Sequence, residues 1–198
     1  MFAGHLDLSF PLVTVVPDVL DEAACATLIA RIESGEAERA PVIGRVGERD
    51  VGEVVDDRRT NTRVMFDDAE LARSLYARVR PSLPALVFGR APCGCNERIR
   101  LYRYGPSQRH SAHWDTPLVL DHVESALTFV VYLNSLGADD DPAGLRGGST
   151  EFPEIGQRFV PTRGTALLFQ QRVLHEALPV EAGVKYVVRT EVMVPLRK

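Results

Sequence analysis

Beyond residue 97 the sequence changes to a period of two, and no other feature constrains the fold of this chain as strongly. The seven residues from Arg98 to Tyr104 alternate in character, and residues 127–133 form a nearly continuous apolar run. Successive side chains of a strand point to opposite faces, so these patterns predict strands. Further strands are predicted at residues 158–160, 165–170 and 186–194. The second half of the chain is therefore predicted to consist of several short β-strands.

A packing helix is predicted near the start of the chain, after an apolar, β-branched run at residues 8–16 that itself predicts a strand. Through residues 19–33 the apolar side chains recur at four-residue spacing, which places them on one face of a helix. These residues are Leu20, Ala24, Leu28 and Ile32. Pro17-Asp18 is expected to open this helix, and Gly35 marks its end.

A second packing helix is predicted after a short strand at residues 63–66. Asp67 or Asp68 can cap its first turn, and Pro81 ends it. Its apolar stripe consists of Leu71, Leu75, Tyr76 and Val79. Two helices followed by several short strands predict an α+β fold class.

The segment between the first helix and the next strand, residues 35–58, is charged and contains several glycines, with a short apolar interruption at residues 41–46. This pattern predicts a mobile loop or a hairpin beside the core. Loops of this length are usually functional or disordered. We expect a lid over the site described below, and the alternative is a surface loop without a role.

Length and charge narrow the class of protein. A chain of 198 residues is expected to form a single domain that buries most of its apolar surface. A formal net charge of −4 gives no overall attraction to nucleic acid, although it leaves room for a local basic patch. The three cysteines, Cys25, Cys93 and Cys95, are too sparse for a structural zinc site and are expected to be reduced. We find no signal peptide or membrane span, so the expectation is a cytoplasmic protein with no nucleic-acid or membrane partner.

His113, Asp115 and His175 are the candidate metal ligands. Residues at i and i+2 of a strand point to the same side, so His113 and Asp115 can share one ion, and His175 must come from another strand. Two imidazoles and one carboxylate on one face of a metal suit non-haem Fe(II) oxygen chemistry. A His-x-Asp pair alone is weak evidence for a metal site, because it is also compatible with a loop that carries an ordinary surface Asp. The other histidines, His5, His110 and His122, are expected to be structural.

The residues around these ligands resemble the catalytic domain of 2-oxoglutarate/Fe(II) dioxygenases of the prolyl 4-hydroxylase type. The resemblance runs in order through residues 98–191 and rests on short motifs. These are Tyr104, Gln108 and His113-Trp-Asp115, then the turn Gly147-Gly148-Ser149-Thr150-Glu151-Phe152, then Pro161, Gly164, Ala166, Leu168 and Phe169, and last His175, Pro179-Val180, Gly183 and Lys185. The sequence departs from the family at Thr116, where many relatives have Gly, and at His110, where prolyl hydroxylases often have Tyr.

The resemblance implies a double-stranded β-helix, or jelly-roll barrel, at residues 98–198, with residues 1–97 as helical support and lid. It implies Fe(II), 2-oxoglutarate and dioxygen as cofactors, with ascorbate as a stimulant. Lys185, ten residues after His175, would pair with the far carboxylate of 2-oxoglutarate, and Tyr104 would donate a hydrogen bond to it. Arg100 and Tyr102 share the strand face of Tyr104 and are further candidates for co-substrate binding.

Arg189 competes with Lys185 for the same role. It lies on the same strand face as Lys185 but roughly 13 Å further along an extended strand, so one carboxylate is not expected to reach both. Arg189 could instead support the site, contact an acidic group of the substrate, or form an ion pair with Glu191 or Glu151. Trp114, which stands between two ligands, is expected to point away from the metal.

The leading functional prediction is a hydroxylase that acts on an unactivated C–H bond of a peptide residue, an amino acid or a small metabolite. The same cofactors could also support demethylation or desaturation. Halogenation is disfavoured because Asp115 occupies the position that a halide would need. A non-catalytic binding or sensing domain is the alternative from another class. The oligomeric state stays open.

Overall fold

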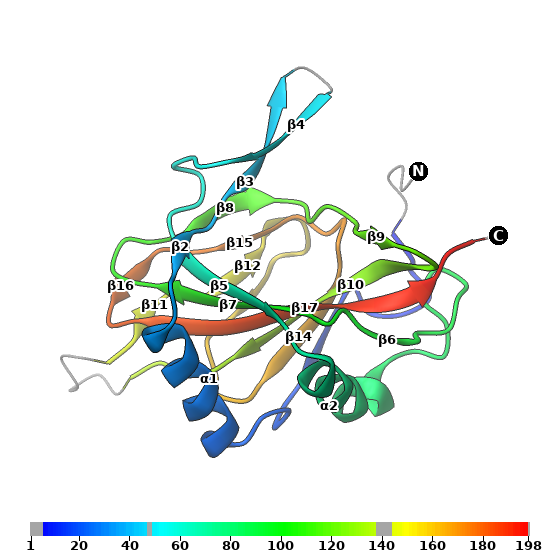
Figure 1. Ribbon diagram of the computed structural model, residues 1–198, viewed down its shortest axis with the longest axis horizontal. Helices are drawn as coiled ribbons and strands as arrows, with labels where there is room; N and C mark the ends of the chain where they lie inside the picture. Colours follow the sequence, from blue (N-terminus) through cyan, green and yellow to red (C-terminus); the bar gives the residue numbers. More distant parts are fainter. Residues whose placement is uncertain (1–5, 47–48, 138–143, 198) are drawn as a thin grey trace.

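The computed structural model describes residues 6–46, 49–137 and 144–197, and its main feature is a large antiparallel sheet (Figure 1). Its strand order is β1-β14-β10-β17-β7-β5-β2. The bounds are β1 Val13–Val16, β14 Ala166–Gln170, β10 Val123–Tyr132, β17 Lys185–Pro195, β7 Arg98–Tyr104, β5 Thr62–Asp67 and β2 Glu38–Arg39. Two short strands lie off this path: β6, Gly94–Cys95, pairs with β17, and β9, Val119–Leu120, pairs with β10.

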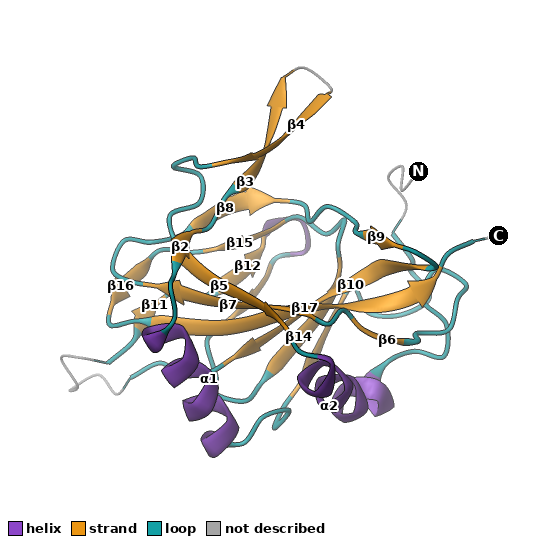
Figure 2. Ribbon diagram, in the orientation of Figure 1, coloured by secondary structure: helices purple, strands orange, loops and turns teal. Residues whose placement is uncertain are grey.

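A smaller sheet packs over one face of the large one (Figure 2). Its order is β13-β12-β15-β8, with bounds Gln157–Phe159, Thr150–Phe152, His175–Ala177 and His110–His113. A separate pair, β11 Arg146–Gly147 and β16 Val180–Ala182, continues beside it. The antiparallel register of β15 and β8 sets His175 opposite His113. Two residues 62 positions apart in the chain thus become direct neighbours.

The alternation of β7 explains how the large sheet separates two apolar clusters. Ile99 and Leu101 belong to an outer cluster that includes side chains of both helices, such as Ile32 and Leu75. The neighbouring positions, Tyr102 and Tyr104, turn to an inner cluster between the sheets. Other members of the inner cluster are Tyr132, Phe152, Leu167, Phe169 and Val187. The period of two therefore lets one strand face the helices on one side and the barrel interior on the other.

Helices α1, Glu22–Ser34, and α2, Ala69–Val79, are found near the predicted positions and lie on the face of the large sheet away from the small one. The Asp68 side chain caps α2 at Leu71 N. Helix α1 begins later than predicted, because Asp18 has a φ of 55°, which a right-handed helix does not allow. Asp21 caps it instead, accepting a hydrogen bond from Ala24 N. Two single-turn 3₁₀ helices, Arg80–Ser82 and Pro153–Ile155, complete the helical content of the described residues, so the protein is mainly β.

Residues 35–58 contain a β-hairpin, as one of the two sequence alternatives predicted. Strands β3, Val42–Val46, and β4, Arg49–Val54, pair with each other and project from the body of the molecule (Figure 1). Residues 47–48, between them, lie outside the described residues, as do His5 and residues 138–143. In the part of the chain that the structure describes, every helix is too short or too polar to cross a bilayer.

Candidate active site

His113, Asp115 and His175 converge on one point, as their spacing predicted. Their candidate ligand atoms all lie within 4.8 Å of one another. The Nε2 atoms of His113 and His175 each stand 3.7 Å from a different oxygen of Asp115. Strand β8 supplies His113, the residues just after it supply Asp115, and β15 supplies His175. The pairing of β8 with β15 therefore builds the cluster.

Backbone carbonyls fix the orientation of both imidazoles. The Nδ1 of His113 lies 2.8 Å from the Ser111 carbonyl oxygen, and the Nδ1 of His175 lies 3.0 Å from that of Val173. Since a carbonyl only accepts, each Nδ1 carries the proton and each Nε2 presents a lone pair to the centre. Burial lowers the pKa of His175 to about 4, so its ring is neutral near pH 7. Neutral imidazoles with free Nε2 atoms are the form that ligates metals.

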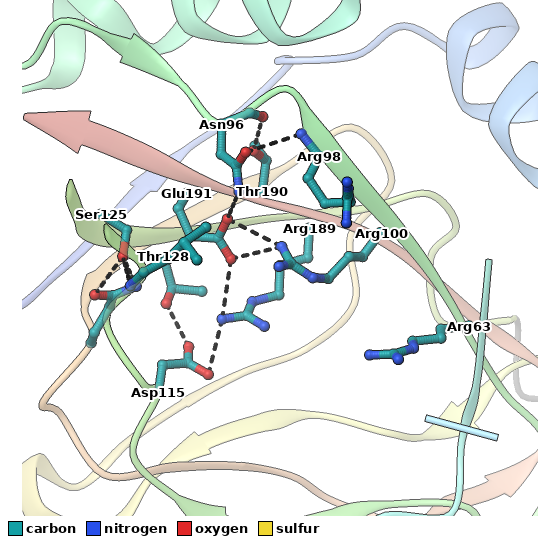
Figure 3. Close-up of polar contacts among 12 residues, drawn as sticks. Arg63, Asn96, Arg98, Arg100, Asp115, Ser125, Thr128, Arg189, Thr190 and Glu191 are labelled. Carbon is teal, nitrogen blue, oxygen red and sulfur yellow. Dashed lines mark hydrogen bonds and ion pairs between the residues drawn. The ribbon is translucent and has the colours of Figure 1, made fainter. Parts of the chain in front are cut away.

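The Asp115 carboxylate is buried and held by two neighbours (Figure 3). Thr128 donates its hydroxyl to Oδ2, and Arg189 forms an ion pair with Oδ1 at 3.0 Å. Burial alone would raise the pKa of Asp115, but Arg189 and the adjacent imidazoles outweigh it and hold the pKa well below its usual range. Asp115 therefore stays ionised and fixed in orientation.

Glu191 extends this network away from the cluster. Its carboxylate forms ion pairs with Arg189 at 3.5 Å and with Arg100 at 2.9 Å, and it accepts a hydrogen bond from the Asn96 side chain at 2.7 Å. The ion pair between Arg189 and Glu191 is one of the alternatives that the sequence offered. Arg100 is held at Glu191 and does not line the inner cavity described next.

A narrow inner cavity of about 60 Å³ leads from the three candidate metal ligands, hereafter the metal cluster, to Lys185. The Lys185 side chain is 2% exposed, and its Nζ donates to the Gly148 carbonyl oxygen at 2.5 Å. Within the described residues Lys185 has no carboxylate partner, and burial lowers its pKa to about 7. Tyr104 and Tyr132 flank it, with ring centroids 5.2 and 5.4 Å from Nζ. A dry cation without a counter-ion favours an anionic ligand at this end of the cavity.

Gly148 and Thr150 belong to the turn that the resemblance singled out. Gly148 has a φ of 69°, and a Cβ there would lie 3.2 Å from the Lys185 side chain. Thr150 accepts the Tyr132 hydroxyl at 2.7 Å and lines the inner cavity with it. The turn therefore needs glycine for both its backbone and its close contact with the lysine.

The structure adds site residues that sequence reasoning missed. His110, expected to be structural, lines the cavity, and its ring stacks on His113 with centroids 3.5 Å apart. Burial, helped by His113, lowers the pKa of His110 far below its usual value, so its ring is neutral. Arg59 also lines the cavity, with its guanidinium carbon 4.7 Å from the Tyr102 ring centroid. The sequence signal for His110 was its position, since it stands where prolyl hydroxylases often have Tyr, and Arg59 belongs to a fainter part of the same family resemblance.

Tyr102 faces the inner cavity, whereas Trp114 is exposed to solvent. Tyr102 lines the cavity and has three guanidinium groups nearby. Burial alone would raise its pKa, but Arg59, Arg189 and Arg100 outweigh burial and lower it to about 8. Trp114 is 52% exposed, in agreement with the expectation that it points away from the metal ligands.

Comparison with known proteins identifies this arrangement. Residues 99–190 match the family model described as the 2OG-Fe(II) oxygenase superfamily. This part of the chain is therefore a 2OG-Fe(II) oxygenase domain. Its enzyme class is therefore that of the 2-oxoglutarate-dependent dioxygenases, with Fe(II) and 2-oxoglutarate as cofactors, as the sequence resemblance implied. Comparison with curated protein sequences gives no match.

Similar solved structures share the fold of this chain. A viral collagen prolyl hydroxylase from Paramecium Bursaria Chlorella virus-1, in complex with 2-oxoglutarate, has a TM-score of 0.63 at 20% identity, over 93% of this chain and 97% of that one. A Pseudomonas putida prolyl-4-hydroxylase has a TM-score of 0.60 at 20% identity, with 94% and 95% covered. A prolyl hydroxylase from Trichoplax adhaerens, bound to a hypoxia inducible factor peptide fragment, has a TM-score of 0.56 at 17% identity, with 91% and 83% covered.

Proposed function

We propose that the protein is an Fe(II)/2-oxoglutarate-dependent hydroxylase of an unactivated C–H bond, which releases succinate and CO2. One observation carries the proposal: the Nε2 atoms of two histidines and one ionised carboxylate surround a point at the mouth of a cavity that ends in a buried lysine without a carboxylate partner among the described residues. A metal with one carboxylate and two imidazole ligands keeps positions open for a bidentate co-substrate and dioxygen.

His113, Asp115 and His175 would hold the iron. The donor set fits Fe(II), because it offers two imidazole nitrogens and one carboxylate oxygen on one side of the centre. When bound, the iron supplies the redox chemistry that couples dioxygen reduction to decarboxylation of 2-oxoglutarate. The chain itself contributes orientation: Ser111 and Val173 hold the rings, while Thr128 and Arg189 hold the carboxylate.

Lys185 would bind the far carboxylate of 2-oxoglutarate. It lies at the closed end of the inner cavity without a counter-ion, whereas Arg189 already pairs with Asp115 and Glu191. These contacts favour Lys185 over Arg189 for the co-substrate and give Arg189 the supporting role. Tyr104, whose pKa burial raises to about 12, keeps its proton and can donate it in a hydrogen bond to the same carboxylate.

The two facing sheets support the jelly-roll interpretation of residues 98–198, with strands from the first 97 residues joining the large sheet. Four further properties stay predictions: the peptide, amino acid or metabolite nature of the substrate, stimulation by ascorbate, the cytoplasmic location, and the absence of nucleic-acid and membrane partners.

A non-catalytic sensing domain is the second candidate. The complete ligand set together with Lys185 favours catalysis over it.

The test is turnover of 2-oxoglutarate. Purified full-length protein should form succinate only when Fe(II), 2-oxoglutarate and oxygen are all present, and a panel of peptides, amino acids and small metabolites should include compounds that stimulate it. Mass spectrometry should find a gain of one oxygen atom in such a compound. Binding of Fe(II) and 2-oxoglutarate with no turnover across the panel would favour the sensing domain.

A further inference from the structure

A second, roomier cavity lies outside the metal cluster, and its walls are unusually rich in arginine. It has a volume of about 470 Å³, within the range of small-molecule sites, and it shares His113 and Asp115 with the inner cavity. The base of the β3–β4 hairpin forms one wall, and residues 116–118 form another. Six arginines line it, against three carboxylates: Arg58, Arg59, Arg63, Arg100, Arg172 and Arg189, against Glu53, Asp115 and Glu191. This excess is local, because the whole chain carries a net charge of −4.

Four of these six arginines already have acidic partners. Arg63 pairs with Glu38 and Glu53, and Arg58 pairs with Asp56. Arg100 and Arg189 meet at Glu191 (Figure 3). Their charges are therefore neutralised within the protein. The excess positive charge of the cavity comes from the remaining two, Arg59 and Arg172.

Arg59 is buried and has no carboxylate partner within the described chain. Its Nε donates to the Asn61 side-chain oxygen at 3.0 Å, and its Nη1 donates to the Pro41 carbonyl at 3.2 Å. Both of these acceptors are neutral groups. The side chain is thus held firmly, with 7% of its surface exposed, while its charge stays uncompensated.

Arg172 is still less satisfied. Its Nε is buried and has no hydrogen-bond partner, and no ion pair forms at its guanidinium among the described residues. Arg172 follows Gln171, whose carbonyl accepts Asp115 N at 2.9 Å, so the chain places it beside the metal cluster. A buried unpaired donor next to a reaction centre is costly, and an anionic ligand would remove that cost.

We propose that the outer cavity binds a prime substrate that presents a carboxylate group, held by Arg172 and Arg59 while the C–H bond to be oxidised faces the metal cluster. This inference rests on the proposed hydroxylase function. Guanidinium groups suit planar carboxylates, which they can bind through two parallel hydrogen bonds. A neutral substrate would fill the space and leave both charges uncompensated.

Equilibrium binding tests the proposal without turnover. Full-length protein, saturated with Fe(II) and 2-oxoglutarate under anaerobic conditions so that Lys185 is occupied, is titrated with matched compounds: free amino acids, their carboxamides, and short acidic peptides with their amidated counterparts. We expect some carboxylates to bind at least about tenfold more tightly than their amides. Small acids and acidic peptides are separate arms, and they show which source supplies the carboxylate.

Variants then locate the binding group. Arg172→Gln should lower the affinity for the best carboxylate probe by about tenfold or more and leave the affinity for 2-oxoglutarate within about twofold. Arg172→Lys should retain part of the affinity for the probe. Arg58→Gln is the matched control, because Arg58 lines the same cavity but pairs with Asp56, and it should change little. Arg59→Lys preserves the buried charge and complements Arg172→Gln. It should lower the affinity for the probe by less than Arg172→Gln does.

The two proposals fail separately. A panel in which no carboxylate binds more tightly than its amide, or an Arg172→Gln variant with unchanged probe affinity, overturns carboxylate recognition even if Fe(II)-dependent 2-oxoglutarate turnover is present. Absence of Fe(II)-dependent 2-oxoglutarate binding overturns the hydroxylase function, whatever the outer cavity binds.

Discussion

Asp115 combines two roles at the scale of a single residue, since it faces both imidazoles and also neutralises Arg189. We expect Asp115→Ala to abolish Fe(II) binding and substrate-dependent succinate formation, because the change deletes one of three ligands. The overall fold should persist, since the residue lies at the cavity mouth rather than in an apolar cluster. Metal titration, succinate assay and circular dichroism measure these outcomes.

Asp67→Ala is the control for this variant, because Asp67 forms an exposed ion pair with Arg98 and neither residue lines the inner or the outer cavity. An exposed ion pair contributes little to stability because solvent screens it, so this variant should keep its iron and its activity. Near-normal succinate formation by Asp115→Ala would show that the metal assignment is wrong.

Lys185 should govern the affinity for 2-oxoglutarate. Removal of a charge-assisted pair costs about 1.5–3 kcal/mol, so Lys185→Ala should raise the KM for 2-oxoglutarate by about tenfold or more. Arg189→Ala should have a smaller effect on that KM, because Arg189 pairs with Asp115 and Glu191. Steady-state kinetics with varied 2-oxoglutarate compares the two, and a larger effect at Arg189 would reverse their roles.

The lowered pKa of Lys185 also predicts a pH dependence. Below about pH 7 the amine is already charged and pairs directly with the co-substrate carboxylate. Above that pH the free protein holds a neutral amine, so binding must take up a proton, and the affinity should fall by up to about tenfold per pH unit. Calorimetry in buffers of different ionisation enthalpy measures the uptake.

Lys185→Ala provides the control for the pH series. It should lose this proton uptake, which separates Lys185 from Tyr102, whose pKa is about 8. Equal proton uptake by the variant and the original protein would assign the titration to another group.

At the scale of secondary-structure elements, the β3–β4 hairpin borders the outer cavity through Val42 and Glu53. We expect it to act as a lid, because it projects from the body and closure would exclude water from the site. Amide exchange at residues 42–54 should slow when Fe(II), 2-oxoglutarate and a true substrate bind together. Exchange in helix α1, on the far face of the sheet, should not change, and an equally unresponsive hairpin would contradict the lid.

At the scale of the whole molecule, the large sheet separates a structural cluster from a functional one. Leu75 packs in the outer cluster with the helices, so Leu75→Ala should lower the free energy of unfolding by about 2–5 kcal/mol and leave 2-oxoglutarate affinity within about twofold. Phe152 lies in the inner cluster, with its ring centroid 5.9 Å from that of His175. Phe152→Ala should reduce both stability and affinity.

Urea unfolding and co-substrate titration, carried out on both variants, measure the two effects. A large loss of 2-oxoglutarate affinity in a folded Leu75→Ala protein would show that the two clusters are coupled across the sheet. Unchanged affinity in Phe152→Ala would remove the inner cluster from the support of His175.

The sequence alone determined those features that local periodicity and short spacing encode. Alternation and apolar runs predicted β7, β10, β13, β14 and β17. Alternation also placed Tyr102 and Tyr104 on one strand face, because side chains of a strand must alternate between faces. Four-residue spacing gave both helices, although the left-handed Asp18 moved the start of α1 to Glu22. The His-x-Asp motif and the residues around His175 were sufficient to identify the three candidate ligands.

Only the tertiary structure decided which distant charges meet. The ion pair of Asp115 with Arg189 joins residues 74 positions apart, and Arg59 reaches Tyr102 through the alignment of separate segments. Such contacts depend on strand order and register, which no local pattern specifies. The excess charge of the outer cavity also depends on the folded chain. It comes from Arg59 and Arg172, because the other four arginines in the wall form ion pairs that only the tertiary structure shows.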